Sequence, residues 1–222
     1  RICDYVSGMT DRYALNEHKN LYSSDEDNWG IKGDPTSKTM KTIKSICVFC
    51  GSSESVDDNY KAVATELGRA IGKKGVDLVY GGASIGLMGC VAYGVHEEKG
   101  KVIGILPEFF HTKDIRYLDA DELIVTKDMR ERKAKMDERS DAFIVLPGGI
   151  GTLEEAMEIL SMRQLKLSEK PLVFINTGGF YDKLNETFTS MIDLGFAKEN
   201  IRSMYPMTPD PSSALEYILS FH

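Results

Sequence analysis

The 222-residue sequence has no long apolar run and no excess of positive charge. A transmembrane helix needs about 20 consecutive apolar residues, and no segment approaches that length. The net charge of −7 and the sequence pI of about 5.2, without a long basic segment, argue against tight binding to nucleic acid. No signal-peptide pattern is found either. We therefore expect a cytoplasmic protein that binds neither membranes nor nucleic acid.

Cysteine and histidine are scarce, with four residues of each. Cys47 and Cys50 have the spacing of some redox and zinc motifs. They lie, however, in a predicted strand at 45–50, where residues three apart point to opposite faces of a sheet. Both are expected to be buried core thiols, and the histidines show no ligand spacing. The sequence therefore predicts no metal site and no cofactor, in a reducing compartment.

Strand and helix patterns alternate from residue 43 to residue 222, which predicts βαβ units in a Rossmann-like, doubly wound parallel sheet with helices on both faces. Residues 1–42 differ: a helical extension is followed by a polar linker. The expected strands are 45–50, 77–80, 101–106, 122–126, 141–146 and 171–176. The expected helices are 58–74, 86–99, 128–139, 152–167, 180–195 and 212–221.

Three of these strands end in turns rich in small residues: Gly51 to Ser53, Gly81 to Gly89, and Pro147 to Gly151. Parallel strands place such turns at one edge of the sheet, where ligands of open α/β folds bind. The dinucleotide fingerprint and the P-loop are both missing, so hydride transfer and nucleoside triphosphate hydrolysis lose support. A nucleoside monophosphate fits better, because one phosphate needs only one helix N-terminus.

The third turn leads into a predicted helix through Gly148-Gly149-Ile150-Gly151-Thr152-Leu153-Glu154-Glu155. Thr152 and Glu155 have the spacing of a capping box, in which Thr152 would be the N-cap. The three glycines favour a second interpretation, because a turn that leaves room for a ligand needs them and an ordinary cap does not. Both interpretations remain open from the sequence alone.

The predicted helix 128–139 places Arg132 and Lys133 on the same face as Met129 and Met136. Their charges could reach water along the apolar surface. Otherwise an inward-facing arginine needs an anionic partner, since an unpaired buried charge costs several kcal/mol. A phosphate or a carboxylate would satisfy it.

Two motifs carry a family resemblance. Pro147 to Glu155 fits Pro-Gly-Gly-x-Gly-Thr-x-x-Glu, and Met129-Arg130-Glu131-Arg132-Lys133 is similar to Met-His-x-Arg-Lys. Together, at this spacing, they resemble the LOG family, the cytokinin riboside 5′-monophosphate phosphoribohydrolases that are often labelled lysine decarboxylase-like. The resemblance runs from about Lys44 to the C-terminus. Arg130 stands where the family usually has His, and Ala83 where Gly is common.

The resemblance implies hydrolysis of the N-glycosidic bond of nucleoside 5′-monophosphates, such as AMP or N6-substituted AMP, to free base and ribose 5-phosphate. It points to Arg132 and Glu155 as the catalytic pair, and to at least a homodimer. The expected substrate-binding residues are Lys133, Gly148, Gly149, Ile150, Gly151, Thr152 and Glu154, joined from other turns by Ser52, Ser53, Gly82 and Asp114. The helix after the glycine turn could serve an interface or only the core, and Arg163 and Gln164 are candidates to reach a neighbouring site.

Other interpretations remain. A non-catalytic nucleotide-binding or molybdenum-cofactor carrier protein resembles this fold and shares its glycine-rich loops, without needing Arg132 paired with Glu155. Amino-acid decarboxylation would require a Schiff-base lysine for pyridoxal phosphate, and no lysine stands in a recognisable context. Residues 1–22 resemble the C-terminal tail of HD-domain deoxynucleoside triphosphohydrolases, but the His-Asp metal residues of that enzyme are not in this chain.

Overall fold

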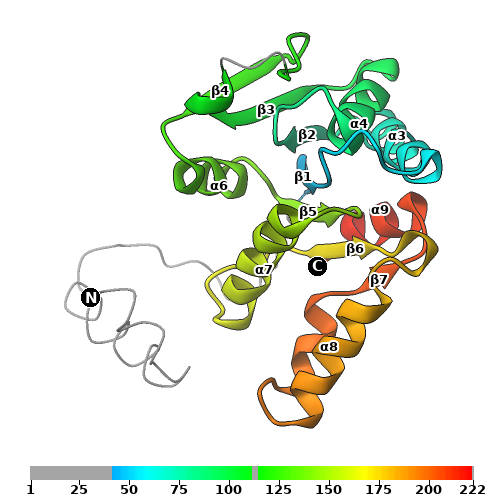
Figure 1. Ribbon diagram of the computed structural model, residues 1–222, viewed down its shortest axis with the longest axis vertical. Coiled ribbons are helices and arrows are strands. Elements are labelled where there is room, and N and C mark those ends of the chain that lie inside the picture. Colours follow the sequence, from blue (N-terminus) through cyan, green and yellow to red (C-terminus); the bar gives the residue numbers. More distant parts are fainter. Residues whose placement is uncertain (1–41, 112–114, 222) are drawn as a thin grey trace. The chain divides into compact units, whose positions relative to one another are not determined.

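A parallel sheet of seven strands organises the computed structural model, which describes residues 42–111 and 115–221 (Figure 1). The chain divides into two units, Arg1–Met40 and Lys41–His222, and the described residues belong to the second. The predicted extension at 1–42, except for its last residue, and the candidate Asp114 lie outside the described residues. The strands are β1 Ser45–Phe49, β2 Asp77–Tyr80, β3 Val102–Pro107, β4 Glu122–Thr126, β5 Ala142–Val145, β6 Leu172–Ile175 and β7 Met207–Thr208.

Helices cover both faces of the sheet, as the alternating pattern predicts. In Figure 1, α6 and α7 lie to the left of the central strands, and α3, α4 and α9 to the right. Each set packs on its own hydrophobic core, and α8 joins the core of α6 and α7. The helices are α3 Asp58–Lys73, α4 Gly86–Glu97, α5 Glu108–His111, α6 Met129–Glu138, α7 Ile150–Gln164, α8 Asp182–Asp193 and α9 Pro211–Leu219, with 3₁₀ turns at Thr177–Gly179 and Glu199–Met204.

Strand β1 shows how one sequence serves both cores. Its side chains alternate between the two faces, so Val48 joins the core under α3, α4 and α9, while Cys47 and Phe49 join the core under α6 and α7. Cys50 falls on the opposite side from Cys47, and both are buried free thiols. The prediction that this cysteine pair diverges is therefore confirmed.

The strand order is β4-β3-β2-β1-β5-β6-β7, and every pairing within the sheet is parallel. The chain moves from β1 outward to β2, and from β5 outward in the opposite direction to β6. Neighbouring loops therefore leave the carboxyl ends of β1 and β5 toward opposite faces and open a crevice between them. This switch point is where an open α/β sheet binds its ligands.

Two local predictions need correction. Helix α7 begins at Ile150 with Gly149 as its N-cap, so Thr152 lies inside the first turn and the capping-box interpretation is wrong. The sequence also missed α5 and β7, because four and two residues are too few to show a period.

No helix within 42–111 and 115–221 is long and apolar enough to cross a membrane.

Candidate functional site

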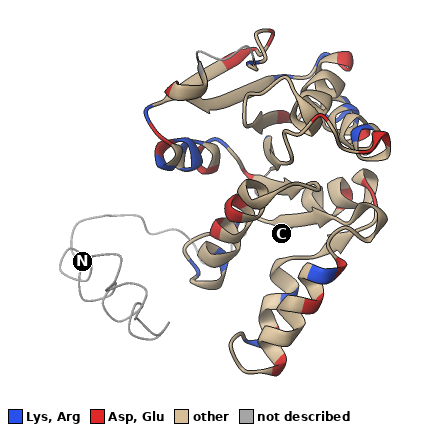
Figure 2. Cartoon of the chain, in the orientation of Figure 1, with Lys and Arg blue, Asp and Glu red and all other residues tan. Residues whose placement is uncertain are grey.

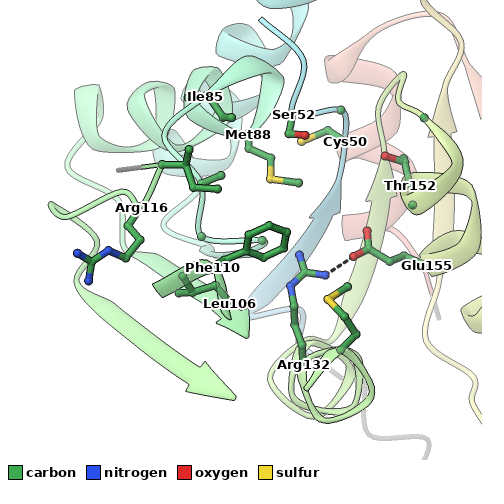
Figure 3. Close-up of a pocket in the computed structure, with 18 residues that line it drawn as sticks. Cys50, Ser52, Ile85, Met88, Leu106, Phe110, Arg116, Arg132, Thr152 and Glu155 are labelled. Carbon is green, nitrogen blue, oxygen red and sulfur yellow. Dashed lines mark hydrogen bonds and ion pairs between the residues drawn. The ribbon is translucent and has the colours of Figure 1, made fainter. Parts of the chain in front are cut away.

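A cleft of about 290 Å³ opens at the carboxyl edge of the sheet, beside the switch point (Figure 3). Its volume lies near the lower end of the range for small-molecule sites, roughly 300–1,000 Å³. All three glycine-rich turns contribute to its lining, and helix α6 closes one side. The turns supply Gly51, Ser52, Gly81, Gly82, Ala83, Gly149, Gly151 and Thr152. The sequence-based expectation of one shared cleft is thereby met.

Arg132 enters this cleft from α6 and is almost completely buried, with 5% of its surface exposed. Its Nη1 donates a hydrogen bond of 2.5 Å to Glu155 Oε1, and its Nε donates to the carbonyl oxygen of Ile105 at 3.0 Å. The guanidinium therefore bridges α7 and strand β3. The charged group is not in contact with bulk water, so the alternative in which Arg132 reaches solvent along the apolar surface is wrong.

The local sequence makes room for this arginine. Asp128 caps α6 by accepting hydrogen bonds of 2.9 Å from the amides of Arg130 and Glu131, which fixes where the helix starts. At Gly81, across the cleft, a Cβ atom would lie 2.5 Å from Arg132 Nη2. A side chain at that position would therefore push the guanidinium away from Glu155.

Glu155 projects from the second turn of α7 and is 7% exposed. Burial raises the pKa of this carboxyl group above its usual range, while the Arg132 guanidinium opposes the shift. The result is a carboxyl group at the edge of a cleft, aligned by an arginine and less strongly acidic than a surface glutamate. Such a group suits proton transfer or stabilisation of a developing positive charge.

Of the three glycines around the start of α7, one packs against a side chain and two face empty space. A Cβ at Gly148 would collide with Thr152 Oγ1 at 2.1 Å, whereas a Cβ at Gly149 or Gly151 would meet no atom within 4 Å. Neither of these two has a positive φ angle. The fold itself thus does not require glycine at 149 or 151, and the absence of side chains at these two positions leaves room for a ligand to approach the backbone closely.

The start of α7 offers hydrogen-bond donors at the same place. The first amides of a helix have no intrahelical acceptor, and Gly149 at the N-cap has no side chain to accept from them. The helix dipole adds partial positive charge. This end of the cleft therefore suits a phosphate group.

The opposite side of the cleft is largely apolar, which the sequence did not reveal. We call it the apolar wall; it comprises Ile85, Met88, Leu106, Phe110 and Ile115, while Met129 lines the cleft from α6. In Figure 3, Met88, Leu106 and Phe110 lie across the cleft from Thr152 and Glu155, and the guanidinium of Arg132 reaches between Phe110 and Glu155. These residues come from separate segments, and apart from Met129 none stands in the two family motifs, so only the fold brings them together with Arg116, which also lines the cleft.

Several predicted residues do not line this cleft. Lys133 turns to the other side of α6, where its Nζ forms ion pairs with Glu154 and, at 2.6 Å, with Glu158. Lys133 and Glu158 border a separate hollow of about 420 Å³ beside α6 and α7, which Glu155 also lines. Ile150 is 83% exposed. Gly148 packs on Thr152, and the Ser53 hydroxyl is hydrogen-bonded to that of Ser55 at 2.9 Å.

The structure accommodates both departures from the family pattern. Arg130 is exposed, as its place on the polar side of the helix predicts. Ala83 is accommodated because the preceding Gly82 takes the positive φ, +76°, of the turn. Among the described residues, no group of three His, Cys, Asp or Glu side chains is placed to hold a metal ion.

Comparisons with known proteins give the family of this chain. Residues 88–218, more than half of the chain, match the family model described as "Possible lysine decarboxylase". The chain is 40% identical over 179 residues to cytokinin riboside 5′-monophosphate phosphoribohydrolase LOG5 of Arabidopsis thaliana, covering 81% of this chain and 78% of that protein. It is 39% identical over 191 residues to the probable enzyme LOGL2 of Oryza sativa subsp. japonica, covering 84% and 78%.

A solved structure with the same fold is the molybdenum cofactor binding protein of Rippkaea orientalis, with a TM-score of 0.62 and 24% identity, covering 81% of this chain and 97% of that one. Residues 1–20 match a different model, described as a phosphohydrolase-associated domain, which agrees with the resemblance seen at 1–22. The family match across residues 88–218 and the identity to the curated relatives establish the larger assignment: the chain belongs to the LOG family.

Proposed function

We propose that this protein hydrolyses the N-glycosidic bond of nucleoside 5′-monophosphates, cytokinin nucleotides among them, and releases the free base and ribose 5-phosphate. Its curated relatives are named as phosphoribohydrolases of this kind. The observation that carries the proposal is the buried Arg132–Glu155 pair, which lies between a phosphate-binding turn and an apolar wall. That order matches the order of phosphate, ribose and base in the substrate.

In this arrangement the phosphate accepts hydrogen bonds from the first amides of α7, next to Gly149, Gly151 and Thr152. The base lies against the apolar wall. The ribose then spans the middle of the cleft beside Glu155, which is where the bond to the base is broken. Lys133 and Glu154, on the far side of α6 and α7, take no direct part in this pose.

The chemistry follows from the charge that develops on the sugar. Cleavage of an N-glycosidic bond passes through an oxocarbenium-like transition state, as in glycoside hydrolysis. The Glu155 carboxylate stabilises the positive charge on the ribose and orients the attacking water, whose oxygen bonds to the sugar carbon as the bond to the base breaks. The carboxylate can accept the proton of this water, and the leaving base takes up one proton in turn. Arg132 holds Glu155 in register, through its second hydrogen bond to Ile105, and its charge favours the ionised form of the carboxyl group.

A second candidate function is binding without turnover, because solved structures with this fold are named as molybdenum cofactor carrier proteins. A carrier needs the anion-binding turn but not a carboxylate beside the sugar. The buried Arg132–Glu155 pair therefore favours the hydrolase. Burying two charges carries a desolvation penalty, and catalysis gives this pair a role that binding alone does not.

The decisive experiment incubates the full chain with AMP and with N6-isopentenyl-AMP and follows the release of adenine and of N6-isopentenyladenine. We expect free base and ribose 5-phosphate in equal amounts, with multiple turnovers per protein molecule. Tight binding of both nucleotides without any base released would favour the carrier function. Base released without ribose 5-phosphate would exclude simple hydrolysis.

Three further expectations belong to this proposal: a homodimer, a cytoplasmic setting and a catalytic domain that spans 43–222. Leu167, just beyond α7, is 58% exposed and is therefore available to an interface next to that helix. Arg163 is less available than expected for a neighbouring site, because it donates to the Met204 carbonyl oxygen and lies 5.7 Å from the Phe221 ring. A light-scattering mass tests the dimer.

A further inference from the structure

A short segment that carries no motif closes one side of the cleft. Residues 115–117 run antiparallel to the turn after β2 through a bridge between Ala83 and Arg116. The Ser84 amide donates to the Ile115 carbonyl oxygen at 2.7 Å, and the Tyr117 amide donates to the Gly82 carbonyl oxygen at 2.9 Å. The Ser84 hydroxyl adds a third hydrogen bond, of 3.1 Å, to the same Ile115 oxygen.

This 115–117 segment and the turn it pairs with both line the cleft, through Ile115, Arg116, Gly82 and Ala83. They lie on the side of the apolar wall, across the cleft from Thr152 at the start of α7 (Figure 3). In the proposed pose, the segment therefore faces the base and not the phosphate.

The segment is fixed from behind by a chain of polar side chains. Tyr117 is 4% exposed, and its hydroxyl is 2.6 Å from His96 Nδ1 on α4. The other ring nitrogen, His96 Nε2, is 3.1 Å from Asp121 Oδ2, which also accepts a hydrogen bond of 2.8 Å from the Val102 amide at the start of β3. The chain thus ties the segment to a helix and to the sheet.

The groups around Tyr117 keep its hydroxyl group protonated and its ring packed in place. Burial and the nearby carboxylates of Asp119 and Asp121 raise the pKa of Tyr117 to about 12, so the phenol stays protonated at neutral pH. Its ring packs edge-on against Tyr93 at 5.1 Å. Tyr117 itself does not line the cleft, so any effect on the substrate passes through Ile115 and Arg116.

We propose that Tyr117 is a positioning residue, held by His96 and Asp121, that fixes the 115–117 segment as the base-side wall of the cleft and thereby sets how well the base is bound. The inference rests on the proposed function for the pose, but its subject is a hydrogen-bonded chain outside the cleft. Removal of the hydroxyl should loosen the wall and weaken recognition of the base, while the phosphate end stays intact.

The test compares Tyr117→Phe with the unaltered full chain, using a substrate and a ligand that lacks the base. For AMP and N6-isopentenyl-AMP we expect KM to rise about threefold to tenfold, as for the loss of one buried hydrogen bond, with kcat changed less than about twofold. The dissociation constant of ribose 5-phosphate should stay the same, because this ligand reaches only the α7 side.

Two matched variants separate positioning from general damage. Tyr93→Phe removes a hydroxyl from the neighbouring ring, which is 48% exposed, and should leave KM unchanged. His96→Ala should behave like Tyr117→Phe, whereas His96→Asn, whose amide can replace Nδ1 as the partner of the hydroxyl, should restore most of the affinity.

Equal weakening of ribose 5-phosphate and AMP in Tyr117→Phe would overturn the proposal, and so would an unchanged KM. Failure of the hydrolase function is a separate outcome: the unaltered protein then releases no base. In that case the dissociation constant of AMP replaces KM, and its ratio to that of ribose 5-phosphate decides the role of Tyr117 by the same criterion.

Discussion

Two ion-pair groups join the same helices, α6 and α7, and their residues are sequence neighbours. Arg132 pairs with Glu155, and the side chains are 6% and 8% exposed. The Lys133 side chain is 19% exposed and pairs with Glu154 and Glu158, whose side chains are 53% and 43% exposed. In Figure 2 the basic segments of α6 lie near the acidic ones at the start of α7. The two groups differ in environment more than in chemistry.

This difference teaches that one step along a helix decides the role of a charge. Adjacent helical residues are about 100° apart, so Arg132 enters the cleft while Lys133 faces the hollow on the other side. Exposed ion pairs contribute roughly 0–1 kcal/mol, and buried ones often contribute no net stability. Stability therefore does not explain why the inner pair is buried, and the proposed catalysis does.

The largest difference between the two groups should appear when each loses a carboxylate. Glu155→Gln keeps the shape and a hydrogen-bond acceptor for Arg132 but removes the charge that would stabilise the transition state. We expect kcat for base release from AMP to fall about 10²–10⁴-fold. Glu154→Gln, the matched control on the outer group, should change kcat less than about twofold. Similar losses in both variants would contradict the assigned roles.

Removal of the cations should separate the groups by stability. Arg132→Met leaves Glu155 buried without its partner and should lower the free energy of unfolding by about 3–5 kcal/mol at pH 7. Lys133→Met should cost less than about 1 kcal/mol. Urea unfolding measures both. The deficit of Arg132→Met should shrink on acidification, because protonation of Glu155 removes the unpaired charge, and a pH-independent deficit would argue against this cause.

The pH dependence of activity should report the raised pKa of Glu155. Since the ionised form is the active one, kcat/KM should rise with pH through a pKa above the ordinary glutamate value of about 4.3. The folded state holds this proton longer than the unfolded state does. The stabilisation from Glu155 is therefore present below its unfolded pKa and is lost as the pH rises through its folded pKa.

The difference in unfolding free energy between the unaltered protein and Glu155→Gln, measured against pH, tests this sign. As the pH rises through that window, the unaltered protein should lose stability relative to Glu155→Gln. A change in the opposite direction would mean that Arg132 outweighs burial and lowers the pKa.

The smallest effects should come from the outer group acting on the inner one across α6 and α7. The Lys133 cation lowers the pKa of Glu155 and the Glu154 carboxylate raises it. Lys133→Met should therefore move the acid limb of kcat/KM to higher pH, and Glu154→Gln should move it to lower pH. Lys135→Met, on the same helix and paired with Glu138, should leave the limb in place. Shifts in the same direction for the first two would refute this coupling.

The sequence could predict the sheet because the apolar runs of β1, β2 and β5 and the glycine turns after them have strong local signatures. It could also predict Arg132 and Glu155, since each stands in a motif. It could not tell that Lys133 turns away from Arg132 into a different environment. That outcome depends on how α6 packs against α7, which no local pattern encodes.

The apolar wall and Tyr117 were also beyond prediction, for a related reason. Leu106, Phe110 and Ile115 are ordinary core-like residues in sequence, and only the fold turns them toward a cleft. The hydrogen-bonded chain from Tyr117 through His96 to Asp121 joins residues 21 and 25 positions apart, with no spacing that signals a contact. The expected helix 152–167 starts two residues after the observed start of α7 at Ile150, and the N-cap is Gly149 instead of Thr152.

The bare space above Gly149 and Gly151 has a practical meaning. A methyl group at either position would touch no other part of the chain, so the folded domain has no reason to reject alanine there. A bound ligand would be affected, because in the proposed pose it lies directly against the backbone at these two glycines. Replacement of glycine by alanine at residue 149 or 151 thus offers a way to keep the fold and block ligand binding.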